Sequence, residues 1–356
     1  MIDGVTTYGS SELLDEIKYT EPVFICTIGT TETSKIEGIT GAGADPELTE
    51  YTPAADVELM VLGQVRCMDN IAQTVIGDAA APTPAILTKA SLELADIPFV
   101  IVDAGSKIKP EIECMNMGRE YGRDIRTGKA VLNPLEIYEN AKELGTKLGM
   151  MHDSLVIGES IAAGTTTALG VLKALGYDAD GKISGCTPVN PHQLKIDVVN
   201  EGLKNSGITP GECDAFQAVG AVGDPTIIAI ASLVLASGAT PIILAGGTQM
   251  VAVCAVIKSI NPNFDFSRVN IATTIYVAED ENADIVNLIE QIDPEISLHV
   301  VDPKFEDSEN PGIRLYTEGF IKEGAGAGGA MLTALMRGAS VSSLRNKIEK
   351  VCQLNK

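Results

Sequence analysis

The sequence predicts an α/β fold with three layers, in which helices cover both faces of a mostly parallel, Rossmann-like sheet. Short apolar runs that end in glycine recur along the chain, and segments with helical spacing of apolar residues lie between them. Runs that are apolar throughout are typical of strands buried on both faces, as in a parallel sheet. Because strands and helices alternate, we expect helix layers on both sides of the sheet.

The predicted strands are rich in Val, Ile and Phe, and glycine or proline bounds most of them. In chain order they are residues 22–29, 98–105, 154–158, 241–246, 269–277 and 298–301. The helices predicted to connect them are residues 134–147, 166–175, 193–205, 225–236 and 283–291.

The two chain ends have the spacing of amphipathic helices, at residues 10–18 and 340–354. The sequence therefore predicts a large α/β nucleotide-binding domain at 20–320 and a small helical subdomain formed by 1–19 with 321–356. Such helices need a surface on which to bury their apolar stripes, and a two-fold partner is the commonest solution.

Charge and composition exclude several classes of protein. The chain has 356 residues and a net charge of −22, so neither nucleic acid nor an anionic membrane is expected as a partner. Pro241 and Gly246 divide the uncharged stretch 225–256 into pieces too short for a membrane span. Seven cysteines without CxxC spacing predict neither a disulfide framework nor a zinc ribbon and fit a reducing compartment, and the three histidines form no pattern of metal ligands. With no secretory signal, a cytoplasmic location is expected.

The segment after the strand at 154–158 reads GESIAAGTTT and precedes an apolar helix. Ligands of such folds bind at the carboxyl ends of the strands. A helix that begins at Gly164 offers free amides and a positive dipole end to a phosphate. No lysine follows Gly164, which excludes an ATP-binding P-loop. The structural alternative is a capped helix after a tight turn.

Three further glycine segments are weaker when each is taken alone. Gly220 precedes Asp224 in GAVGDP, where Asp224 could act only as a helix cap. Gly246 and Gly247 follow a predicted strand, where glycine allows a ligand to approach the backbone. Glu323 lies among small residues in KEGAGAGGA, where poor hydration could raise its pKa toward that of a general base. It could also simply complement a helix dipole.

The segment KEGAGAGGA also contains the pattern G-x-G-x-x-G at Gly324, Gly326 and Gly329. Too little chain follows it for the β-α-β unit of a dinucleotide-binding fold. An NAD-dependent oxidoreductase would instead need a glycine fingerprint after the first predicted strand, where the chain reads GTTETS from Gly29. That class is therefore disfavoured.

Taken in order, these segments resemble the nicotinate-nucleotide:dimethylbenzimidazole phosphoribosyltransferases of cobalamin lower-ligand assembly, as a divergent archaeal-type branch. The resemblance covers roughly residues 20–335. It rests on the order and spacing of PVFICTIG, VDAG, GRDIRTG, GESIAAGTTT, PIILAGG and KEGAGAGGA.

The resemblance implies transfer of the ribose 5-phosphate of nicotinate mononucleotide to a benzimidazole-type base, which yields nicotinate and an α-ribazole phosphate. It implies that Glu323 accepts the proton of the base and that Thr40 lies in the base pocket. It also implies a homodimer, and a reaction that needs neither a metal nor a cofactor. Without the resemblance, Lys195 would be interpreted as an ordinary exposed helix lysine. The residues expected to bind the nucleotide and its phosphate are Glu159, Gly164, Thr165, Thr166, Lys195, Gly220, Asp224, Gly246 and Gly247.

The sequence departs from the pattern of that family at two positions. Ala245 precedes Gly246 where bacterial members have aspartate, and Ala221 stands in place of the second glycine of a pair. These departures leave open an alternative function, in which the protein binds nicotinate mononucleotide without transferring its ribose phosphate. They also leave the accepted base undetermined.

Overall fold

A twisted central sheet organises the computed structural model, which describes residues 2–42, 45–69, 74–76 and 79–354. The sheet has 8 strands. The edge strand at residues 5–8 pairs antiparallel with its neighbour, and all other neighbouring strands are parallel. Across the sheet the strands are β1 (Val5–Tyr8), β10 (Ser297–Val301), β9 (Val269–Thr274), β8 (Ile242–Ala245), β7 (Ser154–Ser160), β2 (Pro22–Gly29), β5 (Phe99–Gly105) and β6 (Met115–Asn116).

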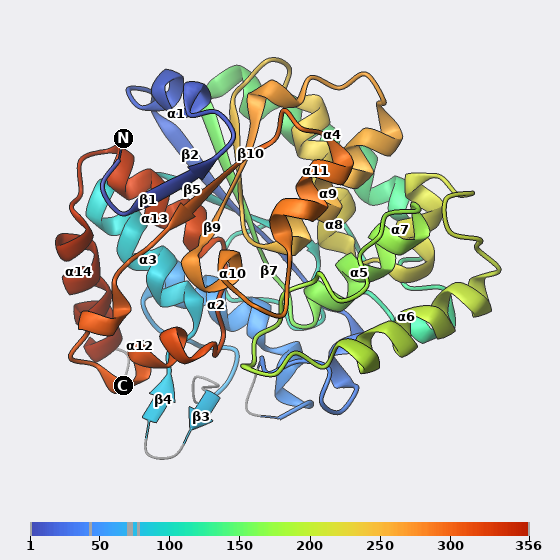
Figure 1. Cartoon of the computed structure of the whole chain (residues 1–356), viewed down its shortest axis with the longest axis horizontal. Helices are drawn as coiled ribbons and strands as arrows, with labels where there is room; N and C mark the ends of the chain where they lie inside the picture. Colours follow the sequence, from blue (N-terminus) through green and yellow to red (C-terminus); the bar gives the residue numbers. More distant parts are fainter. Residues whose placement is uncertain (1, 43–44, 70–73, 77–78, 355–356) are drawn as a thin grey trace.

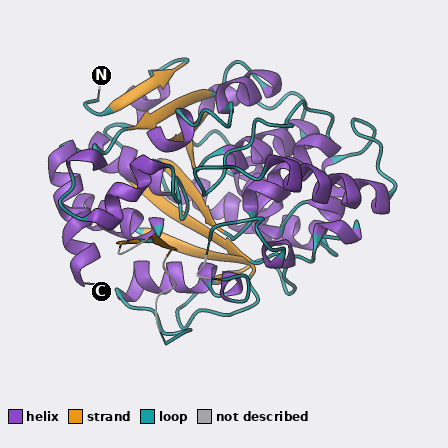
Figure 2. Cartoon of the chain, turned by 60° about the horizontal axis from the view of Figure 1, so that its bottom comes forward, coloured by secondary structure: helices purple, strands orange, loops and turns teal. Residues whose placement is uncertain are grey.

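Helices cover both faces of this sheet, and Figure 2 shows the strands between the two groups. The predicted three-layer α/β fold with a mostly parallel sheet is thus confirmed. One layer contains α1 (Glu12–Ile17), α2 (Thr52–Leu62), α3 (Pro84–Ala95), α13 (Ala327–Met336) and α14 (Val341–Leu354). The other contains α4 (Pro134–Met151), α5 (Gly164–Ala174), α6 (His192–Ser206), α7 (Ala215–Val222), α8 (Pro225–Ala236), α9 (Thr248–Ile260) and α11 (Ile285–Ile292) (Figure 1). The short helices α10 (Ile275–Ala278) and α12 (Pro311–Arg314) and the hairpin β3 (Thr74–Ile76) with β4 (Ala79–Ala81) complete these elements.

Strand β2 shows why such sequences form a doubly covered sheet. Successive side chains of a strand point to opposite faces. Val23 and Ile25 of β2 belong to the core under the α4–α9 layer, whereas Phe24 and Cys26 belong to the core under α3 and α13. A strand whose two faces are both buried must be apolar at every position, which is the pattern of PVFICTIG.

The adjacent strands β2 and β7 form the switch point of the sheet. The chain continues from β2 to β5 on one side, while β7 and then β8 lie on the other. Connections that leave in opposite directions open a crevice at the carboxyl ends of the two strands, where ligands bind in open α/β sheets. The fold thus directs the search for a site to the segments that follow β2, β7 and β8.

Several elements differ from the sequence prediction, which contained neither the helices α2, α3 and α7 nor the strands β1, β3, β4 and β6. The predicted strand at 269–277 is wrong at its end, because β9 stops at Thr274 and α10 follows. The hydroxyl group of Thr274 donates to the carbonyl of Lys322 at 2.6 Å, so the chain leaves the sheet there to meet the segment before α13. Strand β1 was not predicted. It has only four residues, alternates in burial and pairs antiparallel at the edge of the sheet.

The chain ends are built into the main layers. β1 extends the central sheet, α13 packs on its strands and on α3, and α14 packs on α3. The apolar residues of α1 and α14 are buried in the same core as those of α3 and α13. A separate subdomain of 1–19 with 321–356 stays a prediction, and these contacts weigh against it. They also remove the reason for a homodimer that rested on unburied terminal helices. Within the described residues, no helix combines the length and the apolar character needed to cross a membrane.

Candidate functional site

A pocket lies at the carboxyl ends of β2, β7 and β8, beside the switch point of the sheet. Its walls come from residues 40–42 after β2, residues 159–165 after β7 and residues 247–249 after β8. The segment 321–325 before α13 and one face of α2 close it. The loops after Gly29, Gly158 and Gly246 thus converge on one pocket, as expected for segments at the carboxyl ends of parallel strands. None of the described residues that follow Gly105 toward β6 lines the pocket.

The first turn of α5 forms one wall. Ala163 precedes the helix in a left-handed conformation (φ 64°), and Gly164 is the first helical residue. Thr166 and Thr167 both donate their amides to the carbonyl of Ala163. The amides of Gly164 and Thr165 have no acceptor within a helix, because they precede its first complete turn. This wall therefore presents donors suited to an anion.

Gly164 is tightly enclosed, and a Cβ atom there would lie 2.0 Å from Oε1 of Gln249. We expect Gly164→Val to push the Gln249 side chain into the pocket and to weaken binding of the nucleotide that the sequence resemblance implies by about 5-fold or more, since overpacking costs at least about 1 kcal/mol. Calorimetric titration measures the affinity, and a melting curve tests whether the fold survives. Unchanged affinity in the folded variant would contradict a role for this turn in binding.

Lys195 supplies a positive charge beside the α5 turn. It lies on α6 with 1% exposure, so the interpretation as an exposed lysine does not hold. Its Nζ donates to the hydroxyl of Thr165 at 3.0 Å and to the carbonyl of Ser184 at 3.2 Å. Burial lowers its pKa to about 8. No carboxylate of the described chain pairs with it in an ion pair, so the ammonium group is available to an anion held at the helix N-terminus.

Glu323 lies between the end of β9 and the start of α13. Its carboxylate accepts hydrogen bonds from the amides of Gly324, Gly328 and Thr274 at 3.1–3.2 Å. The hydroxyl of Thr273 donates to it at 3.3 Å. These donors favour the ionised form, yet burial outweighs them and raises the pKa of Glu323 to about 7. A carboxylate with this pKa is half ionised near neutral pH, as suits a general base.

The backbone that carries Glu323 is strained. Ile321, Lys322 and Ala325 have φ values of 67°, 56° and 48°, a left-handed conformation that is costly for residues other than glycine and most of all for a β-branched one. A buried ion pair between Lys322 and Asp280, 2.6 Å apart, anchors this segment. Strain of this kind persists where the surrounding structure fixes it, and here it sets the direction of the Glu323 side chain into the pocket wall.

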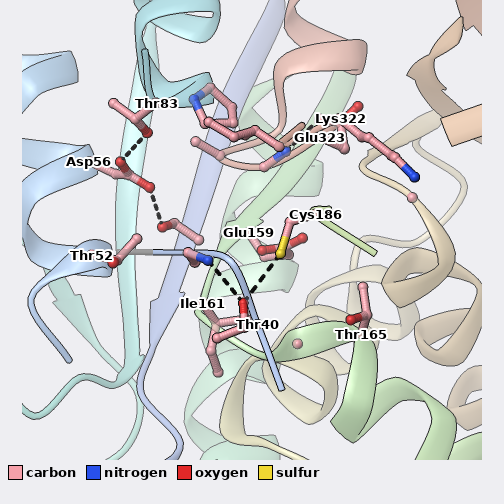
Figure 3. A pocket seen from close by; sticks show the side chains of 18 of the residues that line it. Thr40, Thr52, Asp56, Thr83, Glu159, Ile161, Thr165, Cys186, Lys322 and Glu323 are labelled. Carbon is pink, nitrogen blue, oxygen red and sulfur yellow. Dashed lines mark hydrogen bonds between the residues drawn. The ribbon is translucent and has the colours of Figure 1, made fainter. Parts of the chain in front are cut away.

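Glu159 is the last residue but one of β7 and is 6% exposed. Burial, and then the negative charges of Asp224, Glu323 and Asp56, raise the pKa of Glu159 well above its usual range. Figure 3 shows Glu159 in the middle of the pocket, with Asp56 on one side and Thr165 on the other. A carboxyl group that is protonated here can donate a hydrogen bond to a sugar hydroxyl or carboxylate, which fits the expected contact with the nucleotide.

Sequence reasoning missed several residues of the pocket, among them Asp56 and Cys186. The Cys186 sulfur accepts from the amide of Gly41 at 2.8 Å and lies 3.4 Å from the hydroxyl of Thr40. It thus holds the segment in which Thr40 lines the pocket. Neither residue belongs to the glycine segments that the sequence analysis singled out, so no signal pointed to them. No group of His, Cys, Asp and Glu in the described ranges is arranged to hold a metal ion.

Other residues predicted for the site lie outside the pocket wall. Gly220 is within helix α7, where its carbonyl accepts from the amide of Val131, so it forms no glycine loop and does not contribute to this pocket. Asp224 is fully buried and caps α8 by accepting hydrogen bonds from the amides of Thr226 and Ile227. This is the helix-capping role that the sequence analysis gave as the alternative to ligand binding. Thr166 is fully buried, and of the pair Gly246 and Gly247 only Gly247 lines the pocket.

Comparison with known proteins finds relatives along nearly the whole chain. No family model matches. A "UPF0284 protein" of Methanothermobacter thermautotrophicus is 53% identical over 354 residues, which are 99% of this chain and 98% of that one. A UPF0284 protein of Methanosarcina mazei is 42% identical over 94% of this chain and 95% of its own. One of Sulfolobus acidocaldarius is 41% identical over 92% and 93%.

Two solved structures from Thermus thermophilus have the same fold. CobT superposes with a TM-score of 0.56 at 15% identity, over 92% of this chain and 84% of its own. A nicotinate-nucleotide-dimethylbenzimidazole phosphoribosyltransferase gives 0.59 at 14% identity, over 92% and 86%. The resemblance inferred from the sequence is thereby confirmed at the level of the fold.

Proposed function

Because the chain belongs to the UPF0284 family and has the fold of a nicotinate-nucleotide-dimethylbenzimidazole phosphoribosyltransferase, we propose that it is a phosphoribosyltransferase. Its donor is nicotinate mononucleotide and its acceptor a benzimidazole-type base. The products are nicotinate and an α-ribazole phosphate. We propose a cytoplasmic location, in keeping with the charge and cysteine pattern of the chain.

One observation carries this proposal: the first turn of α5, whose free amides suit an anion, and a carboxylate whose pKa is about 7 line the same pocket. The α5 turn with Lys195 holds the 5′-phosphate, and Glu159 contacts the nucleotide. Glu323 accepts the proton of the base. The positions of Thr165 and Glu323 around the same pocket support this division of roles (Figure 3).

In the proposed reaction, a ring nitrogen of the base uses its lone pair to form a bond to C1 of the ribose. The bond from C1 to the pyridinium nitrogen of nicotinate breaks, and its electron pair neutralises that ring as nicotinate leaves. The attacking ring becomes cationic, so the proton on its other nitrogen becomes acidic and passes to Glu323. The carboxylate is preorganised by its amide contacts and stabilises the developing charge before it takes the proton.

The direct test incubates the protein with nicotinate mononucleotide and a panel of benzimidazoles and measures free nicotinate and the new nucleotide by chromatography. Both products should appear in equal amounts and depend on the base. Absence of nicotinate with every base would overturn the proposed transfer.

The second candidate, a protein that binds nicotinate mononucleotide without transfer, is favoured by one feature of Glu323. Its oxygens accept hydrogen bonds from the amide of Gly328 in the first turn of α13, as a purely structural cap would. Nucleotide binding without nicotinate release would identify this function.

The pH dependence follows from two pKa values. Glu323 acts only when ionised, so lowering the pH below its pKa of about 7 reduces the rate up to tenfold per unit. Lys195 binds phosphate only when charged, so raising the pH above about 8 weakens nucleotide binding. We therefore expect kcat/KM to be bell-shaped, with its maximum between these values. A rate that stays constant from pH 5 to 7 would contradict the role of Glu323.

A homodimer remains part of the proposal through the resemblance alone. Sedimentation at micromolar concentration should give twice the mass of the 37.4 kDa chain. A monomer would exclude it.

A further inference from the structure

One end of the pocket is apolar but contains a buried carboxylate. Ala55 and Leu59 of α2, Val65 and Ala81 form this end. Asp56 lies among them on the same helix and is 5% exposed. Burying a carboxylate is costly unless its charge is compensated, so its presence in an apolar wall needs an explanation.

The protein itself satisfies only part of the acceptor capacity of Asp56. The hydroxyl of Thr83 donates to Oδ1 and that of Ser160 to Oδ2, each at 2.6 Å (Figure 3). An ionised carboxylate accepts about four hydrogen bonds, so two positions remain. No described lysine, arginine or histidine forms an ion pair with Asp56. Burial raises its pKa only to about 6, because the two hydroxyls oppose the shift, so it is mostly ionised at neutral pH.

A second polar atom of the same helix face also lacks a partner. Thr52 lies one turn before Asp56 on α2 and lines the pocket, and its hydroxyl oxygen is buried without a hydrogen-bond partner in the described part of the chain. Buried polar atoms of native proteins are nearly always paired. An orphaned hydroxyl and an undersaturated carboxylate on one wall are consistent with a ligand that supplies the missing polar group.

The backbone connects this end of the pocket to Glu323. Thr83, which binds Asp56, is followed by Pro84, and Pro84 is the nearest neighbour of a Cβ built on Gly324, at 3.2 Å. A flat ring bound beside Pro84 would therefore have Glu323 toward one edge and Asp56 toward the other. If the azole nitrogen faces Glu323, the remote edge of the base faces Asp56.

We propose that Asp56 is a specificity-determining residue, which selects azole bases carrying a hydroxyl or amino donor on the ring edge remote from the reacting nitrogens. This inference rests on the proposed function for the identity of the ligand as an azole base. A donor completes the hydrogen bonds of Asp56, whereas a methyl group in the same place leaves the two remaining acceptor positions of the buried carboxylate unfilled. A site built to receive a hydrogen bond rejects the analogue that lacks it more strongly than an apolar site rejects added size.

The test uses bases of nearly equal shape: 5-hydroxybenzimidazole and 5-aminobenzimidazole against 5-methylbenzimidazole. Binding of each base to the full chain is measured by calorimetry, in the presence and absence of nicotinate mononucleotide, and nicotinate release is measured in parallel. The wild type should prefer a donor-bearing base by about tenfold or more in affinity. Asp56→Leu, which keeps the size of the side chain, should reverse the preference, and Asp56→Asn should reduce it. Melting curves report whether the variants fold.

The outcomes separate the two proposals. A donor preference in binding without nicotinate release would overturn the transfer reaction and leave the role of Asp56 intact. Nicotinate release with equal use of the methyl and donor-bearing bases would overturn the role of Asp56 alone, and this wild-type result decides even if a variant fails to fold. If none of the three bases binds, both are overturned.

Discussion

Replacing Glu323 with glutamine is expected to reduce the rate of nicotinate release by ~10²- to 10⁴-fold, the usual contribution of a general base. The amide cannot take the proton of the attacking base, while the α5 turn and Lys195 still hold the nucleotide. Single-turnover measurement of nicotinate release, together with titration of nicotinate mononucleotide, separates chemistry from binding. We expect the affinity for the nucleotide to change by less than about threefold, since Glu323 is not assigned to it.

The same substitution should also cost stability, because the amide group of glutamine would place a donor against the amides of Thr274 or Gly328. An unmatched donor of this kind costs about 1–3 kcal/mol, so the rate must be expressed per folded molecule from a melting curve. Glu318→Gln is the matched control, because Glu318 is exposed and lies outside the pocket wall. A Glu323→Gln rate within about threefold of the wild type would remove Glu323 from the mechanism and leave it as a cap of α13.

The parts of the fold that the sequence could predict are those in which burial is continuous. β2 was predicted at its observed bounds, because a strand covered on both faces carries an unbroken apolar run between a proline and a glycine. α8 was predicted equally well, since Asp224 and Pro225 mark its start. β1 had no such signal: VTTY is short and half exposed, and only its pairing with β10 makes it a strand. The end of β9 was overestimated because β-branched and aromatic residues continue into α10.

The residues of the candidate site also divide into those with a local sequence signal and those without one. Gly164 could be found because glycine is needed where the backbone approaches another group closely. Glu323 could be found because a run of such glycines follows it in the sequence. Gly220 is the opposite case, a glycine inside α7 that has no such role in the pocket. Asp56 could not be found, since its meaning depends on Ser160, 104 residues away, and on its place in an apolar wall. Contacts between distant segments are not encoded in any local pattern.

Lys195 is a residue whose environment depends on contacts between distant segments. Its sequence context predicted an exposed helix residue, whereas the structure encloses it behind Thr165 and Ser184. A buried ammonium group is costly, and its lowered pKa of about 8 records that cost. The cost is offset when an anion binds beside it. The uncompensated positive charge of Lys195 therefore suits a dianionic phosphate at the start of α5.

Lys195→Met is expected to weaken binding of nicotinate mononucleotide by about 10- to 150-fold, the value of one charge-assisted hydrogen bond in a buried site. Methionine fills the space of the lysine stem, so α6 should stay packed, and removal of a buried charge should leave the melting temperature equal or higher. Lys204→Met on the same helix is the control, because Lys204 is exposed. For nicotinate riboside, which lacks the phosphate, the variant and the wild type should bind equally well. The fall of kcat/KM at alkaline pH should be absent in the variant. Equal weakening for the riboside would show that Lys195 acts on the sugar or on the pocket shape, and the phosphate would then have to bind elsewhere.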